Sequence, residues 1–134
     1  MTIAQLTSPP SVVVFSSEGS TLRMMSEALD GDWQVIGCAD PANARDYLIR
    51  PGTCMVLVDD SNIGAVTAGR LLDQIHQWSP RSLVAYIATN HSAEVERHVR
   101  SHNVQYYFTK PIDSEHMTRV LRSFANSARR LVEF

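Results

Sequence analysis

Residues 55–60 read Met-Val-Leu-Val-Asp-Asp, an unbroken apolar run that ends directly in two carboxylates. A short continuous run of this kind is typical of a strand buried on both faces, as in a parallel sheet. The carboxyl ends of the strands are where open α/β sheets form their functional crevice. We therefore predict a central strand that delivers Asp59 and Asp60 to this edge of a sheet.

The rest of the chain alternates short apolar runs with amphipathic segments. Strands are predicted over residues 12–15, 33–38, 83–88 and 104–108, and helices over 21–29, 41–50, 65–78, 93–102 and 114–131. Strict alternation predicts a parallel sheet with helices on both faces. Five such units fit an α/β, flavodoxin-like three-layer sandwich with strand order 2-1-3-4-5.

Composition and length limit the alternatives. The 134 residues suit one domain, which we predict over residues 11–134 after a loose lead-in at residues 1–10. The net charge is −2 and opposite charges are mixed along the chain, so we expect no nucleic-acid surface. Apolar runs are strand-sized and no secretory leader is evident, so we expect a cytoplasmic protein without a membrane span.

Two other site types are disfavoured by the residues themselves. A dinucleotide-binding half needs a glycine-rich loop after the first strand, and residues 16–20 contain a single glycine. His98 and His102 have the i, i+4 spacing of a zinc-binding pair, but no third ligand is evident. An exposed polar helix explains this pair better.

Polar side chains follow the predicted strands at the edge where a 2-1-3-4-5 sheet has its crevice. They are hydroxyls, carboxylates and the chain's single lysine. A carboxylate there can act as a nucleophile or metal ligand, and a lysine can pair with a phosphoryl oxygen. The residues concerned are Ser16, Ser17, Glu18, Asp59, Asp60, Thr89 and Lys110.

Residues 107–113, Tyr-Phe-Thr-Lys-Pro-Ile-Asp, carry the most specific family signal. They resemble the fifth-strand signature of receiver domains in two-component response regulators, and residues 55–59 resemble the strand that delivers the phosphoacceptor in that family. The resemblance extends over roughly residues 11–130. It implies a bacterial signalling domain without enzymatic activity of its own.

The same resemblance assigns roles to individual positions. It implies that Asp59 is the phosphoacceptor, that Lys110 contacts the phosphoryl group through a segment whose lysine–proline bond is commonly cis, and that Tyr107 is the aromatic switch. Thr89 would supply the phosphoryl-contacting hydroxyl. However, Ala88 occupies the usual position of that hydroxyl, and a one-residue slip reverses the direction of a side chain in a strand.

The metal side of the site departs from the family pattern. Receivers carry two acidic residues after the first strand, where this chain has Ser16 and Ser17. Because Mg²⁺ prefers carboxylate ligands, we expect weak Mg²⁺ binding at most, and no other cofactor. Asp59, Asp60 and Glu18 are the remaining weak candidates for metal ligands.

Three functions remain open. The first is an atypical receiver that acts as a protein-interaction module, with absent or weakened Mg²⁺-dependent phosphorylation. The second is an active phosphoacceptor, phosphorylated on Asp59 by a histidine kinase. The third is a small flavodoxin-like cofactor-binding protein, which ranks last. For the first two we expect a kinase or an effector domain as partner. A homodimer through the face of the helix at 93–102, the strand at 104–108 and the last helix is a further expectation.

Overall fold

Each strand of the computed structural model overlaps a predicted strand and is followed by a helix, although the last strand begins at Tyr106, two residues later than predicted. The model describes residues 10–29, 31 and 33–133, with the side chains of all of these except 41 and 128–133. The expected lead-in lies outside this set, apart from residue 10. In chain order the elements are β1 (Ser11–Phe15), α2 (Gly19–Ala28), β2 (Gln34–Cys38), the 3-10 turn η1 (Pro41–Asn43), α3 (Ala44–Leu48), β3 (Thr53–Asp59), α4 (Gly64–Trp78), β4 (Leu83–Ala88), α5 (Ala93–Arg100), β5 (Tyr106–Thr109) and α6 (Ser114–Glu133).

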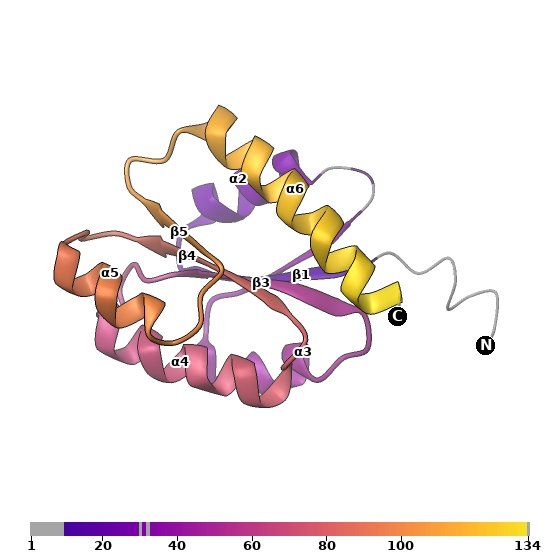
Figure 1. Cartoon of the computed structure of the whole chain (residues 1–134), viewed down its shortest axis with the longest axis horizontal. Coiled ribbons are helices and arrows are strands. Elements are labelled where there is room, and N and C mark those ends of the chain that lie inside the picture. The colour runs from indigo at the N-terminus through magenta and orange to yellow at the C-terminus, as the bar shows by residue number, and fades with distance from the viewer. Residues whose placement is uncertain (1–9, 30, 32, 134) are drawn as a thin grey trace.

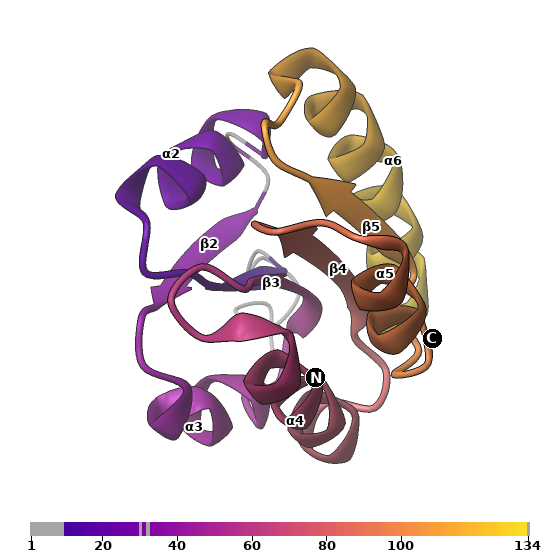
Figure 2. The same cartoon turned by 90° about the vertical axis from the view of Figure 1, so that its left-hand side faces the viewer.

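The strands form one parallel sheet in the order β2-β1-β3-β4-β5, which confirms the predicted topology. Helices α2 and α6 cover one face of the sheet, and α3, α4 and α5 cover the other (Figure 1, Figure 2). Because side chains alternate between the faces of a strand, each core strand contributes to both apolar layers. Val12 and Val14 lie in the layer under α2 and α6, whereas Val13 and Phe15 lie in the layer under α3–α5.

The expected helix after Asp40 is shorter and begins differently. Asp40 Oδ1 accepts a hydrogen bond from the Ala42 amide at 3.0 Å, at the start of the 3-10 turn η1 and not of α3. The turn is 3-10 because the Asn43 amide donates to the carbonyl of Asp40, three residues back. The α-helical part is only five residues long.

The register places the polar strand ends at one level of the sheet. Phe15 pairs with Val58, and Asp59 pairs with Ile87. Ser16 therefore follows β1 beside the end of β3. On the far side of β4, Ala88 pairs with Thr109, so that Lys110 also leaves the sheet at this edge. The fold thus brings the residues that follow β1, β3 and β5 to one crevice, as expected.

Candidate functional site

Asp59 lies at the centre of the crevice, with its carboxylate enclosed by four hydrogen-bond donors. It is 2 % exposed. Its Oδ2 accepts from Ser16 Oγ at 2.9 Å and from Thr21 Oγ1 at 2.8 Å. Its Oδ1 accepts from Lys110 Nζ at 3.0 Å and from the Ser61 amide at 3.1 Å. An ionised carboxylate offers about four acceptor positions, so these donors satisfy it.

This enclosure controls the ionisation of both charged partners. Burial acts to raise the pKa of Asp59, but the Ser61 amide, the Lys110 ammonium and the two hydroxyls outweigh it and hold that pKa below its usual value. Burial acts to lower the pKa of Lys110, but the carboxylates of Asp59 and Glu18 outweigh it and raise that pKa. Asp59 is therefore ionised and Lys110 protonated at neutral pH.

Asp60 does not join this cluster. Because consecutive strand residues point to opposite faces, Asp59 faces α2 and Asp60 faces the layer under α3–α5. There Asp60 Oδ2 accepts from the buried hydroxyl of Tyr86 at 2.6 Å, and its Oδ1 accepts from the Thr89 amide at 2.7 Å. Burial and the Asp60 carboxylate raise the pKa of Tyr86 far above its usual value. Asp60 thus ties β3 to the end of β4.

The hydroxyl of Thr89 does not reach Asp59. Its Oγ1 is buried and has no hydrogen-bond partner among the described residues, while its backbone amide serves Asp60. In the sequence this hydroxyl comes one position after the one that receivers use, which Ala88 occupies here. In the structure it makes no hydrogen bond with the Asp59 carboxylate. Its expected role toward a phosphoryl group stays a prediction.

The other two candidate residues after β1, Ser17 and Glu18, contact different partners. Glu18 Oε2 pairs with Lys110 Nζ at 3.2 Å, whereas Ser17 Oγ accepts from Asn62 Nδ2 at 2.7 Å in the loop after β3. A small cavity of about 20 Å³ adjoins the site. Its volume suits about one water molecule. The lining residues are Phe15, Ser16, Ser17, Cys38, Ala39, Asp59, Ser61 and Ile63.

The donor set around Asp59 does not fit Mg²⁺. The ion prefers carboxylate oxygens in a near-octahedral set. Here the two positions after β1 offer neutral hydroxyls, one of which donates to Asp59, and Glu18 faces a cation instead. Within the described residues, no three or more His, Cys, Asp or Glu side chains gather into a metal-binding group. No described helix is both long and apolar enough to cross a membrane.

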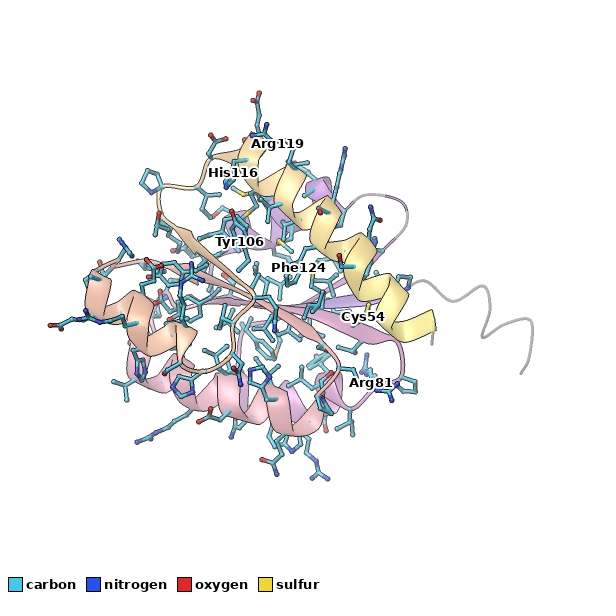
Figure 3. All side chains as sticks on the ribbon, viewed as in Figure 1. Cys54, Arg81, Tyr106, His116, Arg119 and Phe124 are labelled. Carbon is cyan, nitrogen blue, oxygen red and sulfur yellow. The ribbon has the colours of Figure 1, made fainter. Side chains whose placement is uncertain are left out.

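The two tyrosines of β5 point to opposite faces of the sheet, because consecutive strand residues alternate. Tyr107 is 9 % exposed, stacks on Tyr86 with ring centroids 5.8 Å apart, and joins its hydroxyl to His91 Nδ1 at 3.0 Å. Tyr106 lies on the other face, where its hydroxyl meets His116 Nε2 of α6 at 3.0 Å (Figure 3). Tyr107 therefore sits inward, next to the Asp60–Tyr86 pair, and its role as a switch stays a prediction.

Sequence reasoning missed three contributors to these networks. Thr21, in the first turn of α2, supplies a buried hydroxyl to Asp59. Tyr86 lies within the strand predicted over residues 83–88, and His91 lies between that strand and the helix predicted over residues 93–102; neither was a candidate site residue. The alternation of β4 could have placed Tyr86 on the same face as Asp60. Nothing in the sequence indicated the contact of Thr21, because it depends on how α2 approaches β3.

Comparison with known proteins gives matches in structure alone. The sequence matches no family model. It also matches no curated protein. The fold is similar to a response regulator from Thermotoga maritima, with 19% identity, a TM-score of 0.76, and coverage of 87% of this chain and 98% of that chain. It is also similar to the signal receiver domain of an HD domain-containing protein from Pseudomonas fluorescens Pf-5, with 16% identity, a TM-score of 0.76 and coverage of 92% and 99%.

A CheY-like protein (tadZ) from Pseudomonas aeruginosa PAO1 is similar over 86% of this chain and 98% of that chain, with 14% identity and a TM-score of 0.71. At these identities the likeness concerns the fold, and it confirms the resemblance drawn from residues 55–59 and 107–113 at that level. The chain has the fold of a CheY-like receiver domain. The Lys110–Pro111 peptide bond is cis, as the resemblance implied.

Proposed function

We propose that this chain is a receiver-type signalling domain that acts through protein contacts and in which Mg²⁺-dependent phosphorylation of Asp59 is absent or weak. One observation carries the proposal: the Asp59 carboxylate is enclosed by Ser16, Thr21, Ser61 and Lys110. Neutral hydroxyls stand at Ser16 and Ser17, where the receiver resemblance implies acidic residues.

The chemistry of phosphoryl transfer supports this reading. A transferring phosphoryl group spreads negative charge over its oxygens, and enzymes neutralise that charge with metal ions and cationic side chains. The described crevice offers one cation, Lys110, which already pairs with Asp59 and Glu18. Ser16 and Ser17 add no charge. To attack phosphorus, Asp59 would also have to give up at least one of its four hydrogen bonds.

The proposed partners are proteins: a histidine kinase or an effector domain, in a cytoplasmic two-component-type pathway. A homodimer through α5, β5 and α6 is part of the same proposal. We propose no catalytic activity, no nucleic-acid or membrane partner and no cofactor for this domain.

A specific observation favours the alternative, an active phosphoacceptor. Lys110 Nζ lies 3.0 Å from Asp59 Oδ1, which is the contact that the receiver resemblance implies. A response regulator of this kind would accept a phosphoryl group on Asp59 and bias a two-state element near Thr89 and Tyr107.

One experiment separates the two. The protein is incubated with acetyl phosphate, and separately with beryllofluoride, with and without Mg²⁺. Intact mass is measured for acetyl phosphate, and chemical shifts are followed for beryllofluoride. Asp59→Asn is the matched control. The proposal predicts that any Mg²⁺-dependent change in mass or chemical shift is the same in the unmodified chain and in Asp59→Asn. A Mg²⁺-dependent phosphoryl mass that disappears in Asp59→Asn establishes the phosphoacceptor and overturns the proposal.

A further inference from the structure

Histidine side chains make much of the contact between α5 and α4, which lie side by side on the sheet face opposite α2 and α6 (Figure 1, Figure 2). α5 is short, and Val99 is its one buried side chain. His98 in its last turn and His102 just beyond its end turn their rings toward α4, with ring centroids 5.0 Å apart. The residues that meet here form the α4–α5 seam: His98, His102, Gly69, Asp73 and His76.

The two rings pack against the backbone of α4 at Gly69. A Cβ placed on this residue would stand 2.9 Å from His98 Nε2 and 3.1 Å from His102 Nε2, so both nitrogens face the hydrogen that a glycine has in its place. Neither nitrogen has a hydrogen-bond partner among the described residues. A nitrogen lone pair is compatible with this position, whereas an N–H group would meet no protein acceptor there.

Contacts with α4 define the tautomer of His102. Asp73 Oδ1 lies 2.7 Å from His102 Nδ1, which places a proton on that nitrogen and leaves Nε2 as the lone pair. His76 Nε2 lies 2.6 Å from the carbonyl oxygen of His102 and donates to it. That bond persists when His76 is protonated, because Nε2 keeps its hydrogen. The contact that protonation changes is therefore the one at Gly69.

The other charges of the two helices cancel while the histidines are neutral, since α4 and α5 together carry three carboxylates and three arginines. Asp73, whose side chain is 66% exposed, is the one carboxylate paired with a ring of the seam within the described part of the chain. Glu96 pairs with Arg100. The charged side chains of α4 and α5 that form no ion pair with another described residue are Arg70, Glu94 and Arg97. Two protonated rings would thus share one exposed counter-ion and repel each other across 5.0 Å.

We infer that the α4–α5 seam is an acid-sensitive contact, in which neutral His98 and His102 hold α5 on α4 and their protonation releases it. Histidine is the side chain whose charge ordinarily changes between about pH 5 and 8. His98 contributes most, because it has no carboxylate partner among the described residues, whereas Asp73 partly offsets a charge on His102. α5 belongs to the surface proposed for protein contacts, so acid would alter that surface without any change at Asp59. The inference does not depend on whether Asp59 is phosphorylated.

Amide hydrogen exchange of the whole chain, followed by NMR at a series of pH values, tests this inference. The Val99 amide reports the opening of α5, and the amide of Met25, buried on the other face of the sheet, reports global unfolding. We expect the protection factor of Val99 to fall about tenfold relative to that of Met25 between about pH 8 and about pH 5.5. His98→Gln reduces this fall, because it removes the ring that lacks a counter-ion, and His98→Gln/His102→Gln abolishes it.

The matched control is His116→Gln, which removes a histidine of α6, on the other face of the sheet. It keeps the pH response of the unmodified chain. Circular dichroism melting at the highest pH checks that each variant folds. His98→Gln leaves the contact between His102 and Asp73 in place, so it tests the seam even where the double variant unfolds. Two results overturn the inference: a Val99 protection that does not fall relative to Met25, or a fall in His98→Gln as large as in the unmodified chain.

Discussion

Lys110→Met is the perturbation whose size the structure defines best. It removes Nζ from 3.0 Å of Asp59 Oδ1 and from 3.2 Å of Glu18 Oε2. The side chain of Asp59 is fully buried, so the loss of a hydrogen bond to its charge costs about 1.5–3 kcal/mol. The side chain of Glu18 is 42% exposed, so that ion pair adds about 0–1 kcal/mol.

We therefore expect Lys110→Met to lower the free energy of unfolding by about 1.5–4 kcal/mol at pH 7, the sum of these two contributions. Most of this range lies below the cost of about 3–5 kcal/mol for a buried charge that loses its partner, because Ser16, Thr21 and Ser61 still donate to Asp59. Urea unfolding followed by circular dichroism measures the change, with an unchanged m-value as the check on two-state behaviour.

A double-mutant cycle with Asp59→Asn isolates the pair. The coupling energy between positions 59 and 110 should fall within about 0.5–3 kcal/mol, as for other residues in one hydrogen-bonded network. A loss below about 0.5 kcal/mol for Lys110→Met, the size of an ordinary surface substitution, would refute the reasoning. It would mean that the buried carboxylate does not depend on this cation.

The remaining predictions concern ionisation and packing. The pKa of Asp59 is depressed in the folded state, so the contribution of this carboxylate to stability is complete above the unfolded pKa of about 3.9 and is lost as pH falls through the folded pKa. In urea unfolding at a series of pH values, the stability difference between the unmodified chain and Asp59→Asn should therefore shrink over that range. A constant difference would contradict the direction of the pKa shift. Tyr86→Phe leaves Asp60 Oδ2 without its 2.6 Å donor and should cost about 1.5–3 kcal/mol, measured in the same way, whereas no change would mean that Asp60 finds another donor. Leu121→Ala removes a side chain that is 1% exposed and should cost about 2–5 kcal/mol in thermal or urea unfolding, and a cost below 1 kcal/mol would mean that α6 packs loosely.

The fold could be predicted because its signals are local and repeated. Runs such as residues 55–58 mark strands that are buried on both faces, and the strict alternation with helices leaves few topologies. The strand ends also follow from the topology, so the pairing of Asp59 with Lys110 was predictable in outline. Helix starts were harder to predict: the helix expected from residue 21 begins at Gly19, with Glu18 in the cap position.

The site was harder to predict wherever a contact depends on the approach of two elements. Asp59 and Asp60 were both expected at the site, although consecutive residues of a strand point to opposite faces of the sheet. The contacts of Thr21 with Asp59 and of His91 with Tyr107 depend on the positions of a helix turn and a loop. The convergence of His98 and His102 on Gly69 depends on the packing of α5 against α4.

The central claim is that hydroxyls have replaced the metal side of a receiver site whose acceptor side remains. A Mg²⁺ titration followed by the amide chemical shift of residue 61 tests it most directly, with Ser16→Asp/Ser17→Asp as the matched variant. The variant restores the two carboxylates that Mg²⁺ prefers. The account predicts a saturable Mg²⁺ response at millimolar concentrations in the variant and none in the unmodified chain. A saturable response in the unmodified chain that Asp59→Asn removes would contradict it.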